Sequence, residues 1–108
     1  MKQLTVQDLS AHCTASKALL LDVREPWEVA VAALRLPGVP HKHLPIRTLP
    51  DRIDELDRSQ SIVCICHHGV RSLQVVAFLE RQGFESVYNL AGGIDAWSVE
   101  VDPTVPRY

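Results

Sequence analysis

The chain has 108 residues, with 13 acidic side chains against 11 Lys and Arg and a formal net charge of −2. This length suits one domain with its own core, and the near-neutral charge argues against a nucleic-acid-binding surface. No apolar run approaches the roughly 20 residues of a membrane span, and the N-terminus shows no secretory signal. The three Cys form no disulfide framework, which predicts reduced thiols and a cytoplasmic setting. We expect a single domain over residues 1–108.

Strand-like and helix-like segments alternate along the chain. Residues 5–8 have the Thr-x-x-Asp form of a capping box and predict a short helix that ends near Cys13. The continuous apolar runs 18–23 and 61–66 are typical of strands buried on both faces of a parallel sheet. A last strand is expected at 86–88. The other predicted elements are helices near 27–33, 51–56, 72–82 and 94–97, a loop over 41–50 and an extended surface tail over 101–108. This alternation predicts a small α/β domain with a mostly parallel sheet.

The segment 66–72 leads from the end of a predicted buried strand into a helix. Ligands of open α/β sheets bind at that edge, and the backbone N–H groups of such a loop, with the helix dipole, stabilise an anion. Cys66 would therefore be held there as a nucleophilic thiolate. Gly69 permits a positive φ, and Arg71 offers a planar guanidinium to an oxyanion. We predict Cys66 as the nucleophile, with a substrate-binding loop made of His67, His68, Gly69, Val70, Arg71 and Ser72.

The other two cysteines are predicted to be structural. Cys64 lies two residues before Cys66 on the same strand, inside the apolar run, and is expected in the core. A disulfide between them is unfavourable, because residues i and i+2 of a strand lie about 6.6 Å apart. Cys13 is expected to be partly buried in its short helix.

The histidines raise the alternative of a metal site. His67 and His68 follow Cys66, and His41 and His43 lie on another predicted loop, so that a Cys–His zinc or copper site is conceivable. Because the pattern matches no standard ligand spacing, we expect no metal. His67 and His68 are better interpreted as residues flanking an anion, where their change of charge near neutral pH would tune the loop.

Four segments together resemble the signatures of the rhodanese-like sulfurtransferase family, in the family's order and at its separations. They are residues 21–28, 36–38, 66–72 and 89–97. The resemblance implies a three-layer α/β domain, with a five-stranded, mostly parallel sheet and helices on both faces. It also implies a persulfide on Cys66 during turnover. One departure is Arg35, which stands where many members have a His two residues before the Pro-Gly of the second signature.

The reaction implied by the resemblance is ping-pong. The Cys66 thiolate takes the outer sulfur of a donor such as thiosulfate, and the persulfide then passes it to cyanide or a thiol. Arg71 would orient the anionic donor, and the loop N–H groups would stabilise the anions. The expected partners are a small sulfur donor and acceptor or a protein thiol; no cofactor is expected. Asp22 and Arg24 are either support for the site or a buried pair that holds a strand end. Trp27 and Trp97 are expected to pack in or near the core.

Two other functions compete with this interpretation. A sulfur carrier or binding module, fed by a partner protein, would keep the same fold and the same loop Cys. A phosphatase or arsenate reductase would use a Cys-x₅-Arg loop, whereas only four residues separate Cys66 from Arg71 here. The shorter loop suits one sulfur atom better than a tetrahedral anion, which disfavours the phosphatase.

Overall fold

A five-stranded sheet forms the centre of the protein in a computed structural model that describes residues 2–108. The strand order is β1-β5-β4-β2-β3, and every neighbouring pair is parallel. The strands are β1 (Lys2–Leu4), β2 (Leu19–Asp22), β3 (His41–His43), β4 (Ile62–Ile65) and β5 (Val87–Leu90). The structure thus confirms the expected α/β class with a parallel five-stranded sheet.

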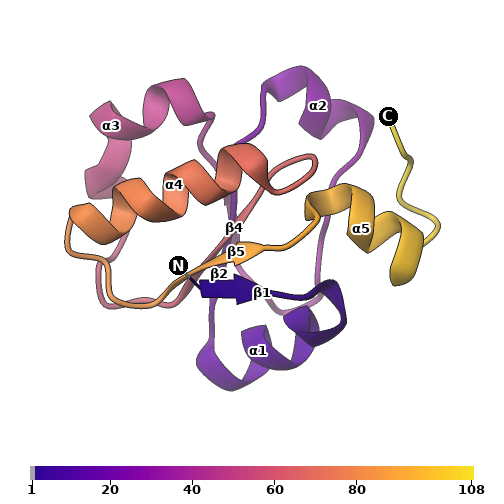
Figure 1. Cartoon of the computed structure of the whole chain (residues 1–108), viewed down its shortest axis with the longest axis horizontal. Coiled ribbons are helices and arrows are strands. Elements are labelled where there is room, and N and C mark those ends of the chain that lie inside the picture. Colours follow the sequence, from indigo (N-terminus) through magenta and orange to yellow (C-terminus); the bar gives the residue numbers. More distant parts are fainter. Residues whose placement is uncertain (1) are drawn as a thin grey trace.

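Helices cover both faces of the sheet (Figure 1). They are α1 (Leu9–Ser16), α2 (Pro26–Val31), α3 (Leu49–Arg52), α4 (Val70–Arg81) and α5 (Gly93–Glu100). Side chains alternate along β2: Leu20 packs with α1 and α5, whereas Leu19 and Leu21 pack with α3 and α4. The continuous apolar run that predicted this strand therefore fills two separate core clusters, one on each face of the sheet.

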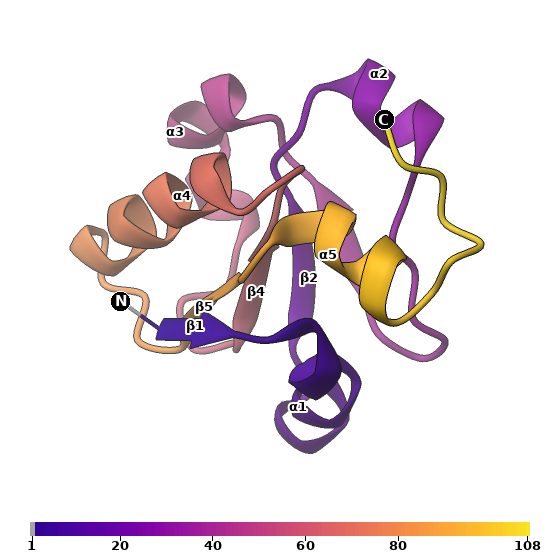
Figure 2. The same ribbon diagram turned by 45° about the vertical axis from the view of Figure 1, so that its right-hand side comes forward.

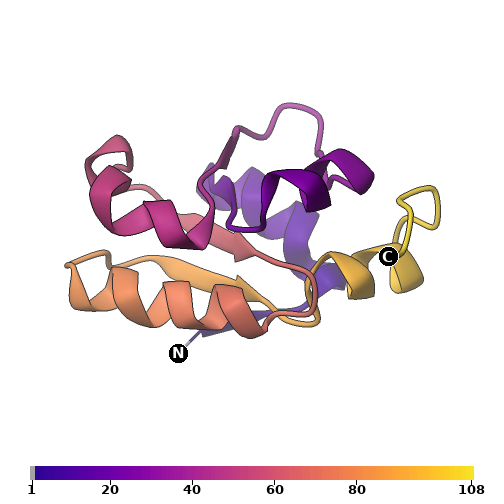
Figure 3. The ribbon, with the colours of Figure 1, turned by 90° about the horizontal axis from the view of Figure 1, so that it is seen from above.

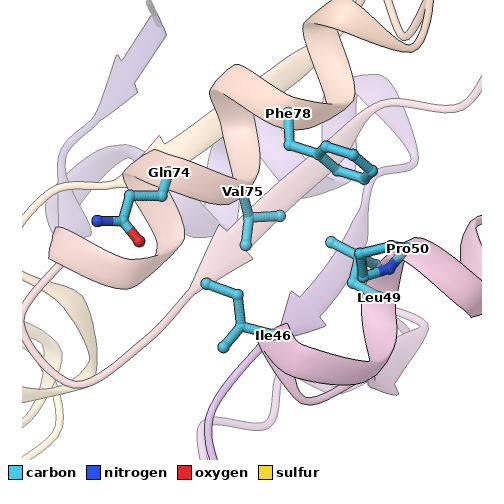
Figure 4. A pocket seen from close by; sticks show the side chains of 6 residues that line it. All are labelled: Ile46, Leu49, Pro50, Gln74, Val75 and Phe78. Carbon is cyan, nitrogen blue, oxygen red and sulfur yellow. The ribbon is translucent and has the colours of Figure 1, made fainter.

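Mostly apolar side chains of α3, α4 and the turn before α3 line a cavity of about 140 Å³ (Figure 4). The two helices lie side by side on their face of the sheet when the molecule is seen from above (Figure 3). The lining residues are Ile46, Leu49, Pro50, Gln74, Val75 and Phe78. Among residues 2–108, no helix has both the length and the apolar character needed to cross a bilayer.

Both edge strands were missed by the sequence prediction. β3 lies inside the segment 41–50 that was expected to be a loop, and β1 precedes the first predicted element. Each has three residues, and β3 consists of His41, Lys42 and His43, so neither carries the apolar run that marks a central strand. Their conformation depends on pairing with β2 and β5, which local sequence does not encode.

The first helix does not begin with the predicted capping box. The Thr5 side chain makes no capping hydrogen bond; instead the chain enters α1 through a 3₁₀ turn, Val6–Asp8, closed by the Asp8 N–H on the Thr5 carbonyl at 3.2 Å. A capping box does form at α2. There Glu25 and Glu28 satisfy each other's backbone N–H groups, and Pro26 occupies the first turn.

The C-terminal segment folds back over the domain instead of remaining an extended surface tail. Val105 is buried, and its carbonyl accepts a hydrogen bond of 2.5 Å from the Ser98 hydroxyl of α5. The chain then runs from α5 to α2, so that the C-terminus lies beside α2 (Figure 2). This places Tyr108 close to the segment that contains Cys66, as described below.

Candidate active site

The Cys66 thiol lies at the base of the loop that joins β4 to α4. We call residues 66–72 the Cys66 loop. The backbone N–H groups of Gly69 and Ser72 donate to the Cys66 Sγ at 3.1 and 3.3 Å, and the Cys66 residue is 1% exposed. Gly69 has a φ of +93°, which lets the chain reverse before α4 begins. The predicted strand–Cys–loop–helix arrangement is therefore present, with two donors aimed at the sulfur.

The first turn of α5 is hydrogen-bonded to the backbone of the Cys66 loop. The N–H groups of Ile94 and Asp95 donate to the carbonyls of Cys66 and His67 at 2.9 and 3.1 Å. Gly93 makes this approach possible, since a Cβ at that position would lie 2.5 Å from the Cys66 carbonyl oxygen. The second glycine of the C-terminal signature thus serves the close backbone approach rather than the chemistry.

A buried polar network lies beside the thiol. The Ser72 hydroxyl is 3.2 Å from the Cys66 Sγ and also donates to the Asn89 Oδ1. The Asn89 amide nitrogen donates to the Gly69 carbonyl at 3.1 Å and to the Gln3 side chain at 3.0 Å. Asn89 was not among the predicted site residues. The sequence offered two signals for it: Asn89 begins the fourth signature segment, and it is a polar residue inside the otherwise apolar end of β5.

Arg71 does not point freely into the loop. Its two terminal nitrogens contact the Glu28 carboxylate at 2.6 and 2.7 Å, a bidentate pair between α4 and α2. Glu28 is 3% exposed, and the Arg71 guanidinium lowers the pKa of this carboxyl from 4.5 to about 2. Glu28 was missed as a site residue, although it ends the first signature segment. Arg71 reaches the neighbourhood of Cys66 as one half of an ion pair, not as a free cation.

Tyr108 completes this side of the site. Its hydroxyl donates to Glu28 Oε2 at 2.8 Å and accepts from Arg24 at 2.9 Å. Burial, the largest cause, raises the pKa of this phenol to about 12. The ring stacks on His67 with centroids 3.8 Å apart and an interplanar angle of 8°. Tyr108, 41 positions after His67 in the sequence, thus contacts the Cys66 loop directly, which no local pattern could have indicated.

The two loop histidines differ in environment. His67 is stacked between Tyr108 and His68, and its Nε2 is buried without a hydrogen-bond partner among residues 2–108. Burial, with the neighbouring His68 charge, lowers the pKa of His67, which favours a neutral ring. His68 is exposed, 3.9 Å from Asp95. In the described part of the chain, no group of three or more His, Cys, Asp or Glu side chains is arranged to hold a metal ion.

Asp22 and Arg24 form a buried ion pair. The Arg24 side chain is fully buried, and its Nη2 contacts Asp22 Oδ2 at 2.7 Å and also donates to the Ala32 carbonyl. Its Nη1 donates to the Glu28 carbonyl. This is the arrangement predicted as a pair that holds the strand end. Arg24 also donates a hydrogen bond to the Tyr108 hydroxyl, and through Tyr108 it supports the Cys66 loop indirectly.

The remaining predicted side chains fall into two groups. Cys64 and Trp97 are buried as expected, and Cys13 is more deeply buried than expected, at 2% exposed. Burial raises the pKa of the Cys64 thiol, which makes it a poor nucleophile. Trp27 is 62% exposed, so the expectation that it packs in or near the core is wrong: it lies on α2, and its ring meets the Tyr108 ring edge-on. The loop residue Val70 is also exposed.

Comparison with known proteins agrees with this geometry. The family model described as "Rhodanese-like domain" matches residues 5–100. The Arabidopsis thaliana "Rhodanese-like/PpiC domain-containing protein 12, chloroplastic" is 44% identical over all of this chain, which spans only 38% of that relative's length. The thiosulfate sulfurtransferase GlpE of Stutzerimonas stutzeri is 35% identical, over 74% of this chain and 70% of the relative. A crystal structure of a rhodanese-like domain protein from Staphylococcus aureus superposes with a TM-score of 0.79, at 30% identity, over 100% of this chain and 99% of that one.

Proposed function

The chain belongs to the rhodanese-like family, and we propose that it transfers a sulfane sulfur through a persulfide on Cys66. The donor is an anion such as thiosulfate, and the acceptor is cyanide or a thiol. The observation that carries the proposal is the convergence of the Gly69 and Ser72 N–H groups on the Cys66 Sγ. Such preorganised donors stabilise a sulfur anion in a site from which water is excluded. The name of the Stutzerimonas relative supports thiosulfate as the donor.

The reaction has two balanced steps. In the first, the Cys66 thiolate attacks the outer sulfur of thiosulfate; the S–S bond of the donor breaks and sulfite leaves with its electron pair. In the second, cyanide or a thiolate attacks the terminal sulfur of the persulfide, and the Cys66 thiolate leaves with the electron pair of the second S–S bond. As written, neither step requires a metal or a cofactor. The three free thiols fit a reducing compartment such as the cytoplasm.

The role of Arg71 changes from that suggested by sequence. Its guanidinium is committed to Glu28, so the pair presents less positive charge to a donor than a free Arg would. We propose that Arg71 acts mainly by holding the first turn of α4 against α2, and that the loop N–H groups bind the donor's anionic sulfur. We propose that the remaining loop residues from His67 to Ser72 also contact the bound donor.

Mass spectrometry after incubation with thiosulfate tests this proposal. We expect the intact protein to gain one sulfur atom, which cyanide removes as thiocyanate. Cys66→Ser should abolish both the gain and the turnover. Cys64→Ser and Cys13→Ser are matched controls that should keep most activity, because neither thiol lies in the Cys66 loop. Turnover of Cys66→Ser above a few per cent of wild type would refute Cys66 as the nucleophile.

The same protein preparation separates the competing functions. Rapid loading from a cysteine desulfurase persulfide, with slow thiosulfate turnover, would identify a carrier served by a partner protein. Hydrolysis of para-nitrophenyl phosphate would support the phosphatase. We expect no hydrolysis, since the four residues between Cys66 and Arg71 make a smaller loop than Cys-x₅-Arg.

A further inference from the structure

The Asn89 side chain has one orientation that satisfies its neighbours. The Gly69 carbonyl, 3.1 Å away, is an obligate acceptor, so the Asn89 atom facing it must be the amide nitrogen. The Asn89 Oδ1 therefore faces the Ser72 hydroxyl and can only accept. The position of one backbone carbonyl thus fixes the direction of the amide without any assumption about hydrogens.

The Ser72 hydroxyl has only one hydrogen for two potential acceptors. Its neighbours are the Asn89 Oδ1 and the Cys66 Sγ, which lies 3.2 Å away. Asn89 is 2% exposed, and among the described residues its Oδ1 has no other donor. Turning the hydroxyl toward the sulfur would leave a buried carbonyl oxygen unpaired, which is costly. The hydroxyl hydrogen therefore remains with Asn89, and a lone pair of the Ser72 oxygen faces Cys66.

We propose that Asn89 is a positioning residue that holds the Ser72 hydroxyl as an acceptor toward Cys66, so that this hydroxyl stabilises the thiol and disfavours the thiolate. The inference deepens the proposed function, since it concerns the activation of the same nucleophile. The hydrogen bonds that stabilise the thiolate then come from the Gly69 and Ser72 N–H groups. Ser72 thus acts on the sulfur in opposite senses: its N–H favours the anion, and its hydroxyl favours the protonated form.

Substitution of Ser72 or Asn89 leaves in place the other charged and titratable groups near the Cys66 Sγ. The Arg71 guanidinium of α4 interacts with Cys66 through its charge, but it is paired with Glu28 of α2. The Cys64 thiol of β4 lies on the same side of the sheet as Cys66. His67 follows Cys66 in the loop, with Tyr108 stacked on it. Among the described residues, none of these side chains hydrogen-bonds to the Ser72 hydroxyl or to the Asn89 side chain, although Cys64 is paired with Asn89 in the sheet. A change in the ionisation of Cys66 after substitution of Ser72 or Asn89 can therefore be attributed to the Ser72 hydroxyl rather than to these groups.

The test is the sign of a pH shift. The rate of Cys66 alkylation by iodoacetamide, followed by peptide-resolved mass spectrometry, has a pH midpoint at which half the thiol is ionised. We expect Ser72→Ala to move this midpoint to lower pH and to raise alkylation about threefold to tenfold at a pH below it, because a lone pair that opposes the anion is removed. A midpoint that rises, or does not move, would overturn the proposal, since a hydroxyl that donates to the thiolate must stabilise it.

Two further variants test the part played by Asn89. Asn89→Ala frees the hydroxyl to donate to the sulfur, so the midpoint should again fall, and in a Ser72→Ala background it should have no further effect. Gln3→Ala is the matched control: it removes the 3.0 Å bond from Asn89 without touching the hydroxyl, and should leave the midpoint unchanged. If Ser72→Ala does not fold, a rise in the midpoint of Asn89→Ala would refute the proposal. Alkylation requires no sulfur donor, so its result is independent of whether the protein uses thiosulfate.

Discussion

The ion pair between Glu28 and Arg71 should make a large, pH-dependent contribution to stability. Glu28 is 3% exposed, and its pKa is lowered from 4.5 to about 2, chiefly by the hydrogen bonds from Arg71. A pKa lowered by this much corresponds to about 3 kcal/mol of native-state stability. Because the folded pKa lies below the unfolded one, this stability is complete above pH 4.5 and is lost as the pH falls toward 2.

Glu28→Gln removes this charge while keeping the shape of the side chain. We expect the free energy of unfolding at pH 7 to fall by about 3 kcal/mol. Hydration of the unpaired Arg71 guanidinium offsets part of this loss, because its side chain is 34% exposed. At pH 3 the difference in unfolding free energy between wild type and variant should be smaller by about 2 kcal/mol than at pH 7. Most of the contribution of the Glu28 charge is lost by then, because the carboxylate becomes protonated. Urea denaturation at pH 7, 4 and 3 measures these differences.

Glu55→Gln is the matched control. The pKa of Glu55 is also lowered to about 2, by Arg52 and Lys42, but the pair lies in solvent, with the Glu55 side chain 37% exposed. Exposed pairs are screened, so we expect the stability profile of this variant to follow that of wild type. A gap between wild type and Glu28→Gln that stays constant from pH 7 to pH 3 would refute the reasoning, because the charge of Glu28 would then not be its source.

Three further changes should affect the site in distinct ways. Gly93→Ala should lower the free energy of unfolding by about 2 kcal/mol or more and the rate of sulfur transfer at least tenfold, because its Cβ would meet the loop carbonyls at 2.4–2.5 Å. Gly38→Ala is the control: Gly38 has a similar φ and nothing within 4 Å, so thermal denaturation should show a loss of only about 1 kcal/mol. Equal losses in the two variants would exclude the steric cause. Tyr108→Phe should keep the stacked ring but cost about 1–2 kcal/mol, since two buried partners lose a hydrogen bond; an unchanged Tm would show that the phenol is dispensable. One residue inserted between Gly69 and Arg71 should cut sulfur transfer by about a hundredfold while circular dichroism shows an intact fold, and full activity would mean that loop size does not select the substrate.

The sequence by itself determined the features that local residues encode. The apolar runs at 18–23 and 61–66 identified two central strands, because strands buried on both faces need apolar side chains throughout. The order strand, Cys66, Gly69, helix identified the loop, since its donors come from the backbone and depend mainly on chain length and one positive φ. The four signature segments then indicated the family, which the comparisons confirmed.

Tertiary structure decided everything that depends on partners distant in the chain. The edge strands β1 and β3 exist because β5 and β2 offer free backbone groups, not because their own residues favour a strand. Arg71 looked like a free cation until Glu28, 43 positions earlier, proved to occupy its guanidinium. Tyr108 and Asn89 reach the Cys66 loop only through the fold, because a side chain's hydrogen-bond partners are set by how elements pack and not by sequence spacing.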